Sequence, residues 1–198
     1  NGTWSGVLEQ ADIDLLADRK LTLQQAVAMQ LGSDTNRISD ACWQGTGDAR
    51  FCVQLDHRDG VGTLIADIPS LPLGWFSSIT RASGYTLDDA RLSGRASLGW
   101  DPAGLTQAQM KLKSEMGRLL IVDRADLLLG YRDLDIDIEF DGREGQAKAS
   151  ANLLPEGRAD AQFTLFRSDA GQFGYDGNIS VLVRQLVAND AATTEITH

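Results

Sequence analysis

Apolar and polar residues alternate along nearly the whole of this chain. The clearest stretch is Asp133-Leu134-Asp135-Ile136-Asp137-Ile138-Glu139-Phe140. Because successive side chains of a β-strand point to opposite faces, a period of two places all the apolar side chains on one face of a sheet. The pattern recurs in about ten stretches, and the first two predict strands over residues 4–16 and 20–31. It predicts an all-β chain with a long antiparallel or mixed sheet that has one apolar face.

The residues predicted to line this apolar face come from strands throughout the chain. They are Leu21, Leu23, Val27, Met29, Trp43, Phe51, Val53, Leu92, Ala96, Leu98, Trp100, Met110, Leu112, Leu134, Ile136, Ile138, Phe140, Phe163 and Leu165. Several equivalent positions carry small residues, namely Gly94, Ala96, Ala147, Ala149, Ala151, Ala159 and Ala161. Bulky side chains would fill the space above the face, whereas small ones leave room there. The pattern therefore favours an open apolar groove over a filled core.

One segment, residues 69–79, breaks the alternation. Ser70 favours the N-cap of a helix, and Pro72 is favourable in a first helical turn. The apolar residues that follow would form a stripe at helical spacing: Leu71, Trp75, Phe76 and Ile79. We therefore predict one short helix near residues 70–80, lying over one end of the apolar face.

The two cysteines of the chain lie in neighbouring predicted strands, joined by Gly45-Thr46-Gly47-Asp48. If the hairpin loop has three residues centred on Gly47, Cys42 lies directly opposite Cys52. Trp43 then faces Phe51 on the other side of the sheet. Directly opposed residues have Cα atoms roughly 4.5–5.5 Å apart, within reach of a disulfide. The alternative is a pair of free buried thiols in a cytosolic protein; we predict the disulfide and an oxidising compartment.

Composition narrows the class of protein further. The chain has 198 residues, which suits a single all-β unit, and a net charge of −10. A negative charge of this size disfavours nucleic acid and anionic membrane surfaces as partners, because both would repel it. The first residues, Asn1-Gly2-Thr3-Trp4, lack the basic and apolar regions of a signal peptide. We expect them to be a cut end within a longer protein.

No candidate for catalysis or metal binding survives a test against its motif. An EF-hand frame begun at Asp137 places Lys148 where a bidentate glutamate is required, so the acidic strand is better explained as a solvated outer face. His57 lies in a predicted polar turn, and the chain has no G-x-S-x-G motif to supply a nucleophile. We expect no catalytic residues, no metal and no cofactor, and therefore a protein that is not an enzyme.

Several short elements, in this order along the chain, resemble the TamB family, the translocation and assembly module inner-membrane subunit of Gram-negative bacteria. They are Trp4-Ser5-Gly6, Cys42-Trp43, Phe51-Cys52-Val53, Leu71-Pro72-Leu73, Leu92-Ser93-Gly94 and Gly177-Asn178-Ile179. The cysteine hairpin followed by Leu-Pro-Leu is the most specific of them. The resemblance points to the conserved C-terminal region of this family, which belongs to the AsmA-like group of bridge-like lipid transporters.

The resemblance implies a fold, a location and partners. It implies that residues 1–198 form a single module of a longer chain, which is anchored in the inner membrane and crosses the periplasm. Its sheet would be curved lengthwise into a U-shaped hydrophobic trough, or β-taco. The apolar-face residues given above would then line a groove that shields phospholipid acyl chains in transit between the two membranes. Another part of the full-length chain would contact the outer-membrane barrel partner TamA.

Two other functions compete with lipid transit. A chaperone or scaffold for outer-membrane β-barrel or autotransporter strands would bind them by strand addition at an open sheet edge. A secreted β-sandwich would instead pack two sheets face to face and leave no continuous channel. The arrangement of the sheet separates these alternatives.

Overall fold

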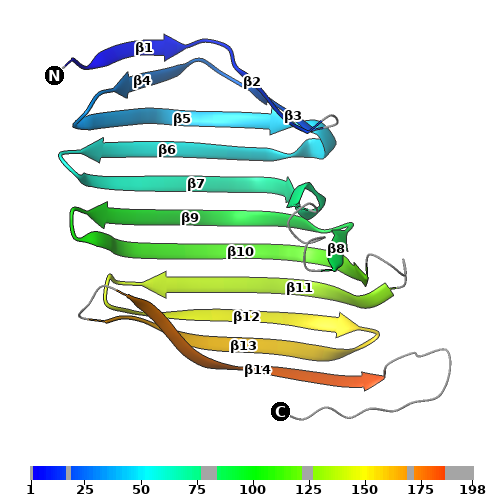
Figure 1. Cartoon of the computed structure of the whole chain (residues 1–198). Helices are drawn as coiled ribbons and strands as arrows, with labels where there is room; N and C mark the ends of the chain where they lie inside the picture. The colour runs from blue at the N-terminus through cyan, green and yellow to red at the C-terminus, as the bar shows by residue number, and fades with distance from the viewer. Residues whose placement is uncertain (1, 17–18, 77–83, 122–126, 169–171, 186–198) are drawn as a thin grey trace.

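A computed structural model describes residues 2–16, 19–76, 84–121, 127–168 and 172–185 and shows an all-β chain (Figure 1). Within these residues, fourteen strands form one sheet: β1 (Trp4–Leu8), β2 (Asp12–Leu16), β3 (Arg19–Leu23), β4 (Val27–Leu31), β5 (Thr35–Gly45), β6 (Arg50–Arg58), β7 (Val61–Pro72), β8 (Tyr85–Asp88), β9 (Arg91–Asp101), β10 (Gly104–Ile121), β11 (Leu127–Phe140), β12 (Glu144–Leu154), β13 (Glu156–Arg167) and β14 (Phe173–Gln185). Two short 3₁₀-helices, η1 (Thr46–Asp48) and η2 (Leu73–Phe76), complete the described elements.

The strands follow one another across the sheet almost in chain order, as Figure 1 shows. The main path runs from β1 through β4, β5, β6, β7 and β9 to β14. The short strands β2 and β3 extend one end of it, and β8 pairs with β10. Every pairing among the described strands is antiparallel, so the mixed alternative is wrong. Because β1 and β14 are at opposite edges, the sheet is open, and the predicted all-β trough architecture is confirmed.

The register aligns apolar residues into rows that cross the whole sheet. In one row, residues directly opposite one another on successive strands are Gly6, Met29, Ile38, Leu55, Leu64, Leu98, Ala108, Phe140, Gly145, Leu165 and Tyr175. A neighbouring row on the other face consists of Gln54, Ile65, Ser97, Gln109, Glu139, Gln146, Thr164 and Asp176. The alternation in the sequence thus becomes one apolar face and one largely polar face.

The N-terminal strands are shorter than the sequence predicts. The strand expected over residues 4–16 is divided into β1 and β2, and the one over residues 20–31 into β3 and β4. At the second break the backbone N–H of Gln24 donates to the carbonyl of Cys42 at 2.9 Å, and the Gln25 side chain reaches the carbonyl of Asp40 at 3.5 Å. Residues 17 and 18, between the two predicted strands, are outside the described part.

Further along, register shifts interrupt the ladder. They occur between Ile38 and Ala41, between Ile68 and Leu71, and between Arg132 and Asp135. Extra residues of this kind bend a strand and increase its local twist. These interruptions therefore provide the bends that a lengthwise trough requires.

The short helix predicted near residues 70–80 begins later than predicted, at Leu73. Strand β7 continues to Pro72, because Ser70 and Leu71 pair with Arg50 and Leu92 in the sheet. In the described part of this segment the four residues of η2 are helical, and residues 77–80, which include Ile79, lie outside the described residues. Trp75 nevertheless reaches the end of the apolar face, since a Cβ atom at Gly45 would lie 2.6 Å from its ring.

Candidate functional site: the apolar face

The predicted apolar-face residues all share one face of the sheet. Leu23 lies opposite Trp43, which lies opposite Phe51. Farther along, Ala96 lies opposite Met110, and Met110 opposite Ile138. The facing residues in these rows of the described strands are apolar. The apolar face is therefore the candidate site, and its candidate chemistry is contact with apolar matter.

Most of these residues are only half-buried. The buried ones are Leu21, Leu23, Val27, Leu112 and Phe140. The half-buried ones are Met29, Trp43, Phe51, Val53, Leu92, Ala96, Leu98, Trp100, Met110, Leu134, Ile136, Ile138, Phe163 and Leu165. In a β-sandwich a second sheet would bury this face, but the described strands form a single sheet. The sandwich alternative does not fit this arrangement.

Two small buried clusters stabilise the face locally without closing it. One consists of Leu23, Val27 and Ala41, at the break between β3 and β4. The other consists of Ala90, Tyr131 and Leu153, with Leu73 of η2 and Val183 of β14 packed against it. Both clusters lie where strands are interrupted, so the packing holds the separate pieces of the sheet together.

Small residues gather on the apolar face of the last strands. Ala149 lies opposite Ala161, and Ala151 lies opposite Ala159, on β12 and β13. Larger residues follow on β14, where Ile179 and Val181 pair with these alanines. Side chains therefore project less from the sheet over β12 and β13 than at the β14 edge, which leaves space above the alanines.

The other face carries cross-strand ion pairs. Cross-strand ion pairs join Arg95 to Asp67 at 3.5 Å, Lys111 to Asp137 at 3.5 Å and Lys113 to Asp135 at 3.2 Å, all between exposed side chains. A polar hollow of about 460 Å³ between β11 and β14 is lined by Asp135, Asp137, Lys148, Arg158 and other residues of this face. The acidic strand is thus part of a solvated face, as we predicted from its mismatch with the EF-hand motif.

Among the described residues, three carboxyl groups have a pKa below the ordinary value, each because of a local hydrogen bond. The Thr22 hydroxyl and then Lys20 lower the pKa of Asp12. The backbone N–H groups of Glu144 and Arg143 lower the pKa of Asp141 in the β11–β12 turn. The Arg158 side chain lowers the pKa of Asp160, and its own pKa is raised by that carboxylate. These bonds stabilise turns and exposed ion pairs and do not prepare an acid or base for catalysis.

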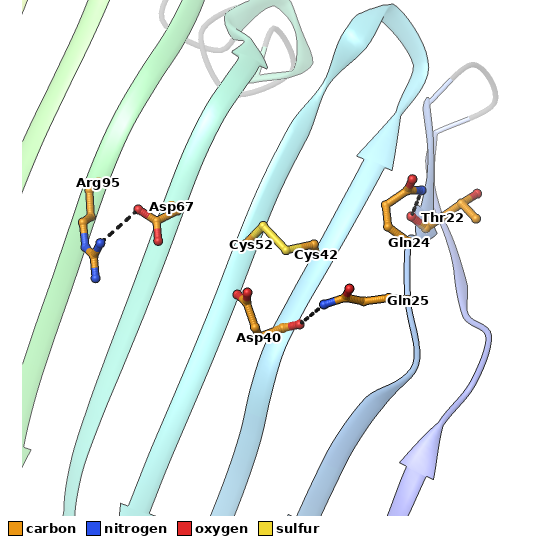
Figure 2. Close-up of a disulfide and its surroundings, with 8 residues drawn as sticks. All are labelled: Thr22, Gln24, Gln25, Asp40, Cys42, Cys52, Asp67 and Arg95. Atoms are coloured by element: carbon orange, nitrogen blue, oxygen red, sulfur yellow. Dashed lines mark hydrogen bonds and ion pairs between the residues drawn. A yellow bond between two sulfur atoms is a disulfide. The ribbon is translucent and has the colours of Figure 1, made fainter.

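A disulfide joins Cys42 and Cys52, whose Cα atoms are 4.0 Å apart. The register is the predicted one: Cys42 lies opposite Cys52, and Trp43 opposite Phe51. Figure 2 shows the bond between β5 and β6, with Asp40 beside it. Asp40 and the two sulfur atoms form a cluster of possible metal donors, but the sulfurs are bonded to each other and therefore offer no thiolate.

Removing this bond is expected to lower stability. With Cys42→Ser and Cys52→Ser together, the free energy of unfolding should fall by about 3 kcal/mol, because the unfolded chain loses a short closed loop. Urea unfolding with and without reductant measures this change. Reductant should shift the natural chain toward the double variant and leave the variant unaffected; equal midpoints for both chains under oxidising conditions would contradict the expectation.

The sequence reasoning missed two polar positions on the apolar face, His57 and Arg167. His57 lies in β6, not in a turn, and its ring stacks on Trp100 with centroids 6.1 Å apart. Arg167 lies in β13 two residues after Leu165 and opposite Phe173 of β14. The signal was present, because His57 continues the alternation of Val53 and Leu55.

An open antiparallel sheet with one largely apolar face defines the structural class of this chain. A comparison with protein-family models matches residues 1–187 to TamB, N-terminal domain, and the chain therefore belongs to the TamB family. Comparisons with curated proteins and with solved structures found no match. Among the described residues, no helix is long and apolar enough to cross a membrane.

The family match corrects one prediction. The resemblance pointed to the C-terminal region of the family, whereas the matching domain is the N-terminal one. Elements of two or three residues are too short to distinguish one β-rich domain of a family from another. Membership associates the chain with a non-enzymatic transport and assembly family that works with TamA in outer-membrane biogenesis, in the envelope of Gram-negative bacteria.

Proposed function

We propose that this chain is a non-enzymatic periplasmic module whose apolar face shields phospholipid acyl chains in transit between the inner and outer membranes. The observation that carries the proposal is the row of apolar residues that crosses the sheet from Gly6 to Tyr175. Each methylene group removed from water contributes about 0.8 kcal/mol, so the face needs no hydrogen bonds to hold a chain. The disulfide fits an oxidising compartment such as the periplasm.

The proposal extends to the whole protein. Residues 1–198 would be one module of a longer chain anchored in the inner membrane, and another part of that chain would contact TamA. A module of this kind needs a continuous surface and not a closed pocket, since acyl chains must move along it. The half-buried state of Leu98, Ile136 and Phe163 supports such a surface.

Site-specific photo-crosslinking tests the proposal. A photoreactive amino acid at Leu92, Ile136 or Phe163 should yield adducts with the mass of phospholipids when the chain is expressed in the envelope. The same amino acid at Gln162 or Thr164, on the polar face of β13, is the matched control and should yield few. A uniform absence of lipid adducts, together with unfolding after every change on the apolar face, would indicate a sealed core instead.

A second function, binding of outer-membrane β-strands, is favoured by one observation. Among the described strands, β14 pairs only with β13, and its apolar side chains are exposed: 60% for Phe173, 74% for Tyr175 and 62% for Ile179. A strand with an apolar face could pair along this edge. Protein adducts with nascent barrel proteins from probes in β14, without lipid adducts on the apolar face, would select this function.

A further inference from the structure

One group of hydrogen-bonding side chains on the apolar face lies at one end of the strands. This end, here termed the turn rim, is formed by the β4–β5, β6–β7, β9–β10 and β11–β12 turns and lies on the left in Figure 1. Asn36, His57, Gly62 and Trp100 form one row of directly opposed residues there. Arg167 occupies the last position of β13, close to the same turns. The rows farther from the turn rim, described above, are apolar.

The row that contains Asn36 places polar nitrogen atoms beside the aromatic ring of Trp100. Nδ2 of Asn36 lies 3.4 Å from Nδ1 of His57, and the imidazole stacks on the Trp100 indole at 19° between planes. Gly62 permits this arrangement, because a Cβ atom there would lie 2.2 Å from the Trp100 ring. The indole therefore lies across the neighbouring strand, and amide, imidazole and indole nitrogens share the turn rim.

Arg167 adds a positive charge to the turn rim. Its Nη2 donates to the carbonyl of Ala103 at 2.5 Å, and its guanidinium lies 5.8 Å from the centre of the Phe173 ring. Phe173 in turn contacts Phe140, with ring centroids 5.5 Å apart. In the described part of the chain no carboxylate pairs with Arg167. A guanidinium has five N–H donors, so one carbonyl leaves most of them available.

Polar groups nearer the other strand ends are engaged with the protein. The hydroxyl groups of Ser114 and Tyr131 lie 3.0 Å apart and are buried. Arg19 donates to the carbonyl of Trp75 in η2. The polar groups toward the opposite ends are thus bonded within the protein, whereas the turn rim carries Arg167, whose guanidinium keeps N–H donors available.

We propose that the turn rim binds the phosphate of a phospholipid headgroup, while the acyl chains extend along the strands away from it. This inference rests on the proposed function and adds an orientation to it. Arg167, Trp100 and His57 supply N–H donors, and phosphate oxygens are acceptors that suit them. Strand β9 has eleven residues and spans roughly 36 Å. An acyl chain occupies about half of a ~30 Å hydrocarbon core, so it fits within the length of one strand.

The orientation is tested on the natural chain with two phospholipid probes. One carries a photoreactive group in its headgroup and the other carries it at the end of an acyl chain. The headgroup probe should label peptides that contain His57, Trp100 or Arg167, and the acyl probe should label peptides that contain Leu71 or Leu153. Equal labelling of both ends by both probes would overturn the inference alone. The absence of labelling by either probe would overturn the proposed function as well.

The charge is tested with Arg167→Gln. Binding of phosphatidic acid should weaken about tenfold, because a charge-assisted contact to phosphate is lost. Diacylglycerol with the same acyl chains should bind within twofold of its affinity for the natural chain, and Arg167→Lys should restore part of the loss. The control is Arg158→Gln, since Arg158 pairs with Asp160 on the polar face at 2.7 Å. Equal losses for both lipids would assign Arg167 a structural role and overturn the headgroup assignment.

Discussion

Replacing Ala161 by aspartate is expected to weaken phospholipid binding about a hundredfold while the chain stays folded. Ala161 is half-buried on the apolar face, between Ala149 and Ile179 on the neighbouring strands. A carboxylate in contact with acyl chains costs roughly 2.5–3.5 kcal/mol, which corresponds to this loss of affinity. Because alanine is small, the substitution creates no cavity, and the new carboxylate still reaches water in the unliganded chain.

The neighbouring residue provides a matched control. Gln162 is exposed on the polar face and lies opposite Lys148 and Asn178, so Gln162→Asp adds the same charge to the same strand. Fluorescent phospholipid binding and the urea unfolding midpoint should be measured for both variants. We expect Gln162→Asp to bind like the natural chain. If both variants lose binding equally, net charge and not the apolar face governs the interaction; if Ala161→Asp unfolds, the face is a sealed core.

Sequence periodicity determined the faces of the sheet more reliably than the ends of its strands. A period of two depends only on each residue and its neighbours, so the alternation around Ile136 and the hairpin register at Cys42 could be derived directly. The breaks at Gln24 and at Ile68 depend on contacts with distant strands. Contacts between strands that are distant in the chain leave no periodic signal in the sequence.

The sequence also predicted only part of the candidate site. The apolar positions followed from alternation, but His57 and Arg167 were not assigned to the apolar face, because a single polar residue does not reveal its strand register. Their meeting with Trp100 and Phe173 joins residues far apart in the chain. A polar residue that continues an apolar alternation, such as His57 after Val53 and Leu55, can therefore belong to the strand and share its apolar face.

Gly94 shows how a small residue can be required for a reason that the sequence pattern does not reveal. The pattern suggested that it leaves space on the apolar face, but its backbone has a φ of +145° and a Cβ atom would lie 2.0 Å from the carbonyl oxygen of Lys111. That oxygen belongs to the backbone of β10, opposite β9 in the sheet. Gly94 also lies opposite Ile68, where the ladder shifts register. A side chain at this position would therefore push β9 and β10 apart beside a bend.

We expect Gly94→Ala to lower the free energy of unfolding by roughly 2–4 kcal/mol, as the sum of backbone strain and steric overlap. Gly99→Ala in the same strand is the control: a Cβ atom there would meet the Thr106 hydroxyl at 3.3 Å, and side-chain movement relieves that contact. It should cost less than about 1 kcal/mol. Urea unfolding of the two variants measures the difference. Equal stabilities would show that β9 adjusts freely at Gly94, and the bend beside Ile68 would then not depend on glycine. If the difference is found, Gly94 stabilises the bend that shapes the apolar face, and lipid binding should fall in Gly94→Ala even at temperatures where the chain is still folded.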